Sequence, residues 1–556
     1  MNKKVCSFPI LFALLTLLIG TCAVVFPASA QAAPTSTGSI TVSGTVARSY
    51  DAYQIFSANV VDGDSDAKIA TDLAWASDAV RDAALPVLHS AGMPNSQTTA
   101  QEAAEWLNTD SHLTSALSAQ LARSLQSSGA ELAALNAGTA AELPCGYWLI
   151  VADDDAIAQG EAGTAPIMVL VGGSAVTVKP KAATPKVSKH VLEDSTAAWQ
   201  KAADATVADD LYWRLSATVP AGLAAYDTYA VRFVDTMSAG LDPSKVAASM
   251  RVYAAAGADG GFDAVSADKD GRAGTEPAKG WTDITAQCAT KVAADGKTFT
   301  VRTGDLIAAL GGADAFTAGA RVVAVYNAPL NSACNHGIAK GNPNEVYLRY
   351  PRSPFADQSG DAGFTRTPSD DACAYTWDLA LTKRGSDGDK PLAGAVLSIT
   401  DDRGRTLSAD GTWDAEGKAT VTTGEDGRVT VSGVDSGKLE VRELKAPKGY
   451  TAFEGTRSVT VKAEGLDVDQ VAAAKPKLTI TAESPLRADS ADGSTGCLEA
   501  SLINTPTGTP PSITTGGFMP STGDMAMYTA AAAAVAGAAL IVVALLVKRG
   551  GGSHKE

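Results

Sequence analysis

Short runs that alternate between apolar and polar residues recur along most of this chain, and they constrain its fold more than any other feature. Gly and Asp turn signals separate the runs, as in antiparallel β-proteins. The clearest runs lie at 39–46, 50–56, 147–151, 167–171, 175–178, 229–234, 322–326 and 346–350. An Ala-rich stretch at 66–135 with periodic Leu, Ala and Trp predicts a helical insert. The pattern predicts β-sandwiches in a row, the first with an α-helical insert.

Both ends of the chain carry targeting patterns. A basic start is followed by an apolar stretch at 8–26 and the small residues Ala28-Ser29-Ala30, which is typical of a signal peptide cleaved after Ala30, with Ala32 as the alternative. An apolar run at 525–547 is long enough to cross a bilayer and is followed by a basic tail. We therefore expect an exported chain whose membrane-bound precursor is held by its C-terminus.

Composition and motif content exclude several classes of function. The formal net charge is −16, so nucleic acid is not an expected partner. The scattered histidines share no metal-type spacing with one another or with Cys, and the Asp-rich stretches at 62–66 and 268–271 lack the later ligands of a calcium loop, which favours polar turns. Neither a Gly-x-Ser-x-Gly elbow nor a phosphate-binding loop occurs. No cofactor and no surface hydrolase are therefore expected.

The cysteines outside the signal peptide can oxidise in an exported chain. We expect a Cys288–Cys334 disulfide, because both fall in the middle segment. We expect a second one between Cys373 and Cys497, which flank the first and last strands of the third segment. Its long loop would stabilise the fold by about 4 kcal/mol in the entropic description. Cys145 is left as a buried apolar residue.

A short motif stands directly before the apolar C-terminal run. It consists of Met519, Pro520, Ser521, Thr522 and Gly523. It resembles the Leu-Pro-x-Thr-Gly sorting signal of Gram-positive wall proteins, with a Met in place of Leu at similar volume. The resemblance implies that a sortase cleaves after the Thr and passes its carbonyl to an amine. An ordinary tail anchor with a chance motif is the alternative.

The third segment is similar to the collagen-adhesin type B (Cna-B) domain of sortase-assembled pilins. Three stretches carry the resemblance: 379–383 with 390–395, the stretch 439–450, and 501–504. The second resembles the pilin E-box, Tyr-x-Leu-x-Glu-Thr-x-Ala-Pro-x-Gly-Tyr, and matches its Glu, Ala-Pro and Gly-Tyr positions. Leu439, Val441 and Leu444 depart from the pattern. The resemblance implies an isopeptide bond between Lys383 and Asn504, formed with help from Glu443.

The expected effect of burial on these side chains supports the isopeptide bond independently of the resemblance. Burial disfavours the charged form of a Lys and lowers its pKa, whereas a buried carboxyl stays protonated. The neutral amine of Lys383 can then attack the side-chain carbonyl of Asn504, while the acid of Glu443 donates to the carbonyl oxygen and ammonia leaves. A solvated Lys, a surface Glu and a linker Asn are the plain alternative.

The middle segment matches the pilin pattern less completely. Lys189 resembles the bond-forming amine of the first strand, and Asp235 lies in a stretch that supplies an aspartate in the family. The family pattern ends in Tyr-Ser-Asn-x-Pro, but Arg352 stands where the Asn is expected, and it has no electrophilic carbonyl. Lys189 then pairs either with Asp235 or with an Asn that the motif does not identify, or the Cys288–Cys334 disulfide replaces the cross-link.

The junction of the first two segments is expected to hold the amine for polymerisation. The pilin motif is Trp-x-x-x-Val-x-Val-Tyr-Pro-Lys, and residues 176–181 match its Val-x-Val and Pro-Lys parts but not its Trp and Tyr. The resemblance implies Lys181 as the acceptor, with Lys179 and Lys186 as nearby competitors. A charged linker without a further role is the alternative.

Together these features resemble a major (shaft) fimbrial pilin: mainly β, with tandem immunoglobulin-like (Cna-type) β-sandwiches, and not an enzyme. The expected partners are a pilin-type sortase, identical subunits, minor pilins and peptidoglycan, in a surface fimbria anchored to the cell wall that supports adhesion. A singly displayed wall-anchored adhesin or minor pilin is the alternative. The expected boundaries are signal peptide 1–30, N-terminal domain 31–180, middle domain 181–365, C-terminal domain 366–507, linker and motif 508–523, and span with tail 524–556.

Overall fold

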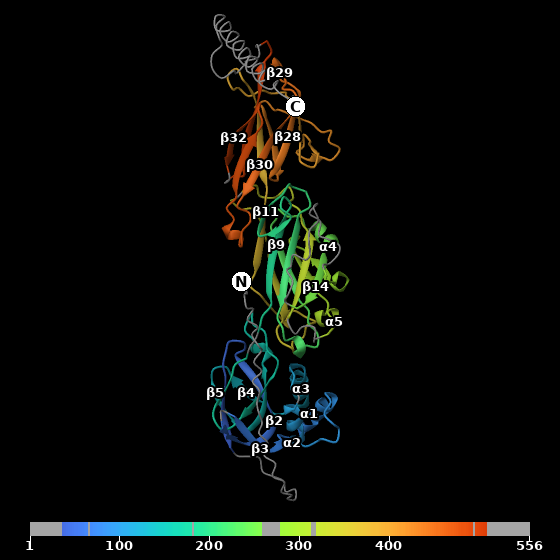
Figure 1. Cartoon of the computed structure of the whole chain (residues 1–556), viewed down its shortest axis with the longest axis vertical. Helices are drawn as coiled ribbons and strands as arrows, with labels where there is room; N and C mark the ends of the chain where they lie inside the picture. Colours follow the sequence, from blue (N-terminus) through green and yellow to red (C-terminus); the bar gives the residue numbers. More distant parts are fainter. Residues whose placement is uncertain are drawn as a thin grey trace, which may run out of the picture.

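The computed structural model describes residues 36–508 apart from 65–66, 110, 181–182, 258–278, 313–318, 338 and 493–494. It is mostly β, with three modules that follow one another along the long axis of the molecule (Figure 1). The expected fold class is confirmed. The expected signal peptide, the expected sorting motif and the apolar run at 525–547 lie outside the described residues. Within the described ranges, no helix is long and apolar enough to cross a membrane.

The first module combines two sheets with three helices. Its sheets have the orders β5-β1-β8 and β3-β2-β6-β7, with β4 paired to β2. Its elements are β1 Thr37–Val42, β2 Ser49–Asp62, β3 Lys68–Trp75, α1 Asp78–Ser90, α2 Ala100–Asn108, α3 Ser115–Ser128, β4 Ala133–Asn136, β5 Ala140–Pro144, β6 Gly146–Ala152, β7 Ile167–Val171 and β8 Val176–Val178. All three helices lie within the stretch expected to be helical, but that stretch begins with strand β3.

Local capping explains where these helices begin. Ser77 and Thr114 accept hydrogen bonds from the first turns of α1 and α3. Thr99 and Glu102 form a reciprocal capping box at the start of α2. Gly129 ends α3 in the left-handed region with φ 72°. The helices gather on one side of the module and pack their apolar faces on the sheet of β2 and β6 (Figure 1).

The middle module is a sandwich of a six-stranded and a seven-stranded sheet. The orders are β10-β9-β12-β18-β14-β15 and β11-β21-β19-β13-β17-β16, with β20 paired to β19. Its elements are β9 Lys186–Glu193, β10 Ala198–Gln200, β11 Ala202–Asp204, β12 Tyr212–Val219, β13 Arg232–Met237, α4 Val246–Ser249, β14 Arg251–Ala256, β15 Thr282–Asp283, β16 Ala289–Val292, β17 Thr298–Arg302, α5 Leu306–Ala309, β18 Ala320–Asn327, β19 Asn342–Pro351, β20 Phe364–Arg366 and β21 Asp370–Tyr375. One continuous apolar core fills the space between the sheets.

The third module is a second sandwich, of a five-stranded and a seven-stranded sheet. The orders are β27-β22-β33-β29 with β32 on β33, and β25-β24-β23-β28-β30-β31 with β26 on β23. Its elements are β22 Trp377–Gly385, β23 Val396–Thr400, β24 Thr406–Leu407, β25 Trp413–Asp414, β26 Val421–Thr422, β27 Arg428–Val434, β28 Gly437–Lys445, β29 Tyr450–Thr451, β30 Thr456–Glu464, β31 Lys477–Ala482, β32 Leu486–Asp492 and β33 Cys497–Pro506. Its first and last long strands, β22 and β33, run parallel as neighbours.

The sheets place one strand differently from the expected boundary at 365/366. That boundary would assign β21 to the third module. Instead β21 pairs antiparallel with β19 and parallel with β11, so it completes the seven-stranded sheet of the middle module. Periodicity identifies a strand but not its partners, because the partners lie far away in the sequence.

The two expected disulfides are wrong, because all five cysteines in the described part of the chain are free. Cys373 lies on β21 of the middle module, whereas Cys497 opens β33 of the third. Cys288 contacts the backbone of Gly304 near the first residue of β13, and Cys334 packs on Gly240 beyond its last residue.

The distance between the two ends of β13 rules out a disulfide between Cys288 and Cys334. A strand the length of β13 spans roughly 20 Å. The two Cα atoms of a disulfide lie within about 7 Å of each other. Cys145 is buried, with an exposed fraction of 1%.

Candidate functional site

The third module buries a Lys, a Glu and an Asn between its two sheets. Lys383 on β22 and Asn504 on β33 come from neighbouring strands, and Glu443 projects from β28 of the opposite sheet. The parallel register sets Lys383 opposite Leu502, so Asn504 lies two residues further along β33. Their exposed fractions are 0%, 2% and 6%, for Lys383, Asn504 and Glu443. The structure thus brings together the three residues that the sequence motif singled out.

The three side chains form one hydrogen-bonded group. Lys383 Nζ donates to Asn504 Oδ1 and lies 3.3 Å from Glu443 Oε1. Asn504 Nδ2 donates to the same Glu443 oxygen at 2.9 Å. The second oxygen of Glu443 accepts from the Phe453 N–H at 3.1 Å, which fixes the carboxyl in place. The acid therefore touches both groups that would react.

Burial makes Lys383 a usable nucleophile. Desolvation lowers the pKa of Lys383 to about 8, against the opposing attraction of Glu443. A much larger fraction of the amine is then neutral near pH 8 than for a solvated Lys. The arrangement can form an amide between Lys383 and Asn504 with loss of ammonia.

The middle module holds a comparable buried group. Lys189 on β9 and Asp235 on β13 are both fully buried, and Lys189 Nζ donates to Asp235 Oδ2. Desolvation lowers the pKa of Lys189 to about 8 and raises the pKa of Asp235, while the charge of each partner opposes the shift of the other. The lowered pKa of Lys189 and the raised pKa of Asp235 both favour a neutral amine beside a protonated acid.

An asparagine that the sequence motif did not identify completes this group. Asn344 on β19 is fully buried, and its Nδ2 donates at 2.8 Å to the hydroxyl of Tyr326. The same hydroxyl accepts from Lys189 Nζ at 2.9 Å. Lys189 and Asn344 thus share a hydrogen-bond partner, and Asn344 supplies the carboxamide that is missing at position 352. The alternation of inward and outward residues along β19 is the sequence feature that could have identified Asn344, because the inward positions of this strand begin with Asn342 and Asn344.

Arg352 has a different role in the fold. It follows β19, and its Nη1 donates to the carbonyl of Asp154 in the first module at 3.1 Å. Its own carbonyl accepts from the Gly163 N–H at 2.7 Å. Nearby, the Tyr350 hydroxyl donates to the Gly160 carbonyl at 2.7 Å. The residue in place of the expected Asn therefore helps to hold the first module against the middle one.

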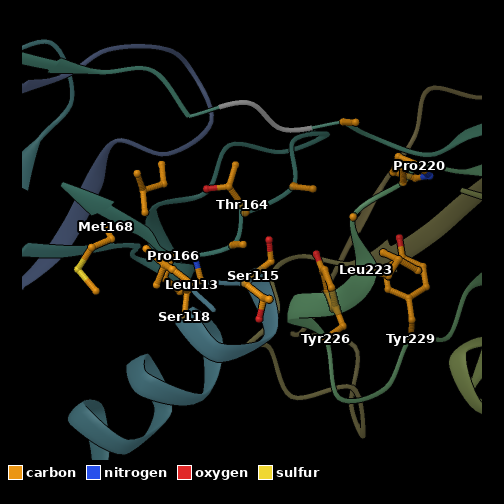
Figure 2. Close-up of a pocket in the computed structure, with 18 residues that line it drawn as sticks. Leu113, Ser115, Ser118, Thr164, Pro166, Met168, Pro220, Leu223, Tyr226 and Tyr229 are labelled. Carbon is orange, nitrogen blue, oxygen red and sulfur yellow. The ribbon is translucent and has the colours of Figure 1, made fainter. Parts of the chain in front are cut away.

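A cavity of about 480 Å³ lies at this same junction. Figure 2 shows Leu223, Tyr226 and Tyr229 of the middle module on one side of it, and Ser115 and Thr164 of the first module on the other. Ala183 also lines it, two residues after the expected acceptor Lys181, which itself lies outside the described residues. The competitors Lys179 and Lys186 are exposed.

Comparison with known proteins identifies one of the modules directly. Residues 378–475 match the family described as SpaA: Prealbumin-like fold domain. This stretch contains Lys383 and Glu443 and ends before Asn504. The matched stretch covers most of the third module, from β22 to the residues just before β31.

Known proteins similar to longer parts of the chain are surface and pilus proteins. One is the Trypsin-resistant surface T6 protein of Streptococcus pyogenes serotype M6, 30% identical over 143 residues, which are 24% of this chain and 24% of that protein. The chain thus matches about a quarter of that relative's length. Among solved structures, the T6 backbone pilin of serotype M6 Streptococcus pyogenes has a TM-score of 0.46 at 17% identity, covering 85% of this chain and 98% of that one. The full-length major pilin SpaD from Corynebacterium diphtheriae has a TM-score of 0.41 at 15% identity, covering 85% and 98%.

Proposed function

We propose that this chain is the shaft subunit of a covalently polymerised surface pilus. A pilin-type sortase would join the carbonyl of Thr522 to the amine of Lys181 on the next identical subunit, minor pilins would join the same fibre, and the last subunit would be passed to peptidoglycan. The chain would be a substrate of the sortase and not an enzyme, apart from forming its own internal amide bonds. The fibre would stand on the cell wall and support adhesion.

One observation carries this proposal: the buried contact of Lys383, Asn504 and Glu443 inside a module that is similar to the prealbumin-like family over residues 378–475. In the proposed step the Lys383 Nζ–Asn504 Cγ bond forms, the Asn504 Cγ–Nδ2 bond breaks, and ammonia leaves. Glu443 would donate to Oδ1 while negative charge develops there. Such a bond would tie the first strand of the module to its last, which suits a subunit that carries tension along a fibre.

The middle module would form a second bond of this kind. Lys189 would attack Asn344, with Asp235 as the acid. This assignment replaces the two alternatives of a Lys189–Asp235 pair and a disulfide. The observation that favours it is that Lys189 and Asn344 share the Tyr326 hydroxyl in a fully buried site.

The polarity of the chain fits head-to-tail growth. The sorting motif would follow β33 at the far end of the third module, whereas Lys181 belongs to the connection between β8 and β9. Pro180 disfavours a helical conformation of the preceding residue and would help to keep the connection extended. Ala183, two residues after Lys181 in the sequence, lines the cavity at the junction of the first two modules, which offers space for the arriving tail of a second subunit.

The test is the size distribution of wall extracts on a denaturing gel. The unmodified chain should give a ladder, and Lys181→Ala should reduce it to a wall-attached monomer. Lys181→Arg should do the same, because a guanidinium stays charged and is a poor nucleophile. Lys179→Ala and Lys186→Ala are the matched controls and should keep the ladder.

Two outcomes would contradict the proposal. A ladder that survives Lys181→Ala would exclude Lys181 as the acceptor. A monomer in extracts of the unmodified chain would favour the singly displayed adhesin or minor pilin. Thr522→Ala should abolish wall attachment altogether and leave the membrane-held precursor, since no threonyl carbonyl could be transferred.

A further inference from the structure

The hydroxyl of Tyr326 lies at the centre of the buried group in the middle module. Tyr326 belongs to β18 of the six-stranded sheet and is fully buried. Its hydroxyl donates to Asp235 Oδ2 at 3.0 Å and accepts from Lys189 Nζ at 2.9 Å and from Asn344 Nδ2 at 2.8 Å. A phenol has one donor and two acceptor positions, so every position is used by a group of this site.

The acid of this module contacts fewer reacting groups than the acid of the third. Glu443 hydrogen bonds directly to the amide nitrogen of Asn504. Among the described contacts, no hydrogen bond joins Asp235 to Asn344, and Asp235 Oδ1 and Asn344 Oδ1 have no hydrogen-bond partner. Tyr326 is the group that connects the acid with the leaving nitrogen.

We propose that Tyr326 is a catalytic residue for the Lys189–Asn344 bond and relays a proton from the attacking to the leaving nitrogen. This inference rests on the proposed function of the middle pair and adds a residue to it. General acid–base groups within hydrogen-bond distance of the reacting atoms contribute about 10²- to 10⁴-fold in rate.

The relay balances in protons and bonds. Neutral Lys189 Nζ attacks Asn344 Cγ and becomes a cationic amine in the tetrahedral intermediate. The Tyr326 hydroxyl turns to Asn344 Nδ2, which has become a basic amine, and gives it a proton while it takes the proton of the Asp235 acid. The Asp235 carboxylate then takes one proton from Nζ, so both Tyr326 and Asp235 end in their starting protonation states. The Nζ–Cγ bond has formed, the Cγ–Nδ2 bond has broken, and ammonia leaves with the relayed proton.

The ring of Tyr326 is held independently of its hydroxyl. It packs edge-on against Phe299, with ring centres 4.8 Å apart, and Lys189 Nζ lies 5.4 Å from its centre. Tyr326→Phe therefore keeps the packing of the ring and removes the hydroxyl with its three hydrogen bonds. Tyr350→Phe is a matched control, because it removes a buried hydroxyl that bonds to Gly160 instead.

The test measures the intact mass of the full chain and maps its linked peptides. Wild type and Tyr350→Phe should lack the mass of two ammonia molecules. Tyr326→Phe should lack only one at isolation, should still contain the Lys383–Asn504 peptide, and should form the middle link at least ~100-fold more slowly on incubation. Formation of the middle link in Tyr326→Phe at the wild-type rate would overturn the inference.

Two further readouts distinguish a catalytic hydroxyl from one that only supports packing. Tyr326→Phe should unfold at the same temperature as Asn344→Ala, which is also unlinked; a much lower value would assign the hydroxyl to packing and overturn the catalytic role. If Asn344→Ala keeps the full deficit of two ammonia molecules, the proposed middle bond is wrong, and the role of Tyr326 fails with it.

Discussion

The middle and third modules bury the same types of side chain in opposite arrangements. In the third module Lys383 and Asn504 come from neighbouring strands of one sheet, and Glu443 reaches them from the other. In the middle module Lys189 comes from the six-stranded sheet, whereas Asp235 and Asn344 come from neighbouring strands of the seven-stranded sheet. The same chemistry would therefore join two strands within a sheet in one case and two sheets in the other.

The two sites differ in position but share the burial of the lysine, which is the property that the proposed chemistry requires. Both lysines are completely buried, and the pKa of each is lowered to about 8 by desolvation. Burial between two apolar sheets acts on the amine in the same way from either direction. What differs is how the acid reaches the amide: directly from Glu443, or through the Tyr326 hydroxyl in the middle module.

The largest effect is expected from removing the acid of the third module. Glu443→Ala should prevent the Lys383–Asn504 bond and leave an unpaired buried amine. Losing a tie across a long loop costs about 4 kcal/mol, and a buried amine without its hydrogen-bond partner costs about 1–3 kcal/mol more. Intact mass measures the missing bond, and thermal unfolding measures the loss of stability. Glu440→Ala, on the exposed face of the same strand, is the control and should change neither.

A smaller effect is expected from Asn344→Ala in the middle module. The chain should gain the mass of one ammonia relative to wild type after correction for the substitution, and it should lose about 4 kcal/mol of stability from the missing loop tie. Asn342→Ala removes a buried Asn two positions earlier on β19, where it bonds to Asn335 and Ala374. It should destabilise the fold and keep the mass deficit, so an equal mass change in both variants would refute the assignment of Asn344.

The two lysines should titrate alike once their bonds are removed. In Asn504→Ala, Lys383 keeps a folded pKa of about 8 against an ordinary lysine pKa of 10.5 in the unfolded chain. The unfolded chain then binds more protons between these values, so stability rises with pH from about 8 towards 10, by up to about 3 kcal/mol. Urea unfolding at pH 7 and pH 9.5 measures this rise. Lys383→Met removes the titrating group and should flatten the curve; an equal rise in that variant would assign the effect elsewhere.

No effect is expected from reductant. All five cysteines of the described part are free, so a disulfide does not explain any difference between the modules. Each should react with an alkylating reagent in denaturant without prior reduction. Cysteines that react only after reduction would contradict the structure and restore the Cys288–Cys334 or Cys373–Cys497 pairing.

The sequence is most informative where local pattern and chemistry coincide. Alternation locates the strands, and the E-box motif singles out Glu443, which the structure brings into contact with Lys383 and Asn504. The middle site shows the limit. The motif at the strand end points to position 352, whereas the inward-facing periodicity of β19 points to Asn344, and only the folded sheets show which of the two positions lies beside Lys189.

The sequence pattern also does not predict which distant strands pair with each other. The parallel contact of β11 with β21 joins residues far apart in the sequence, and no periodicity encodes it. The disulfide expectations fail because being in the same segment does not mean being near in space. Cys288 and Cys334 lie near opposite ends of β13, and Tyr326 becomes visible as a shared partner only once β9, β13, β18 and β19 have been brought together.

Intact mass measurement of the full chain under reducing conditions is the decisive test of whether two of the modules close themselves with covalent bonds. We expect a mass below the calculated value by two ammonia molecules. We also expect two linked peptide pairs in a proteolytic digest, Lys189 with Asn344 and Lys383 with Asn504. A chain at its full calculated mass, with all four residues in unlinked peptides, would contradict it.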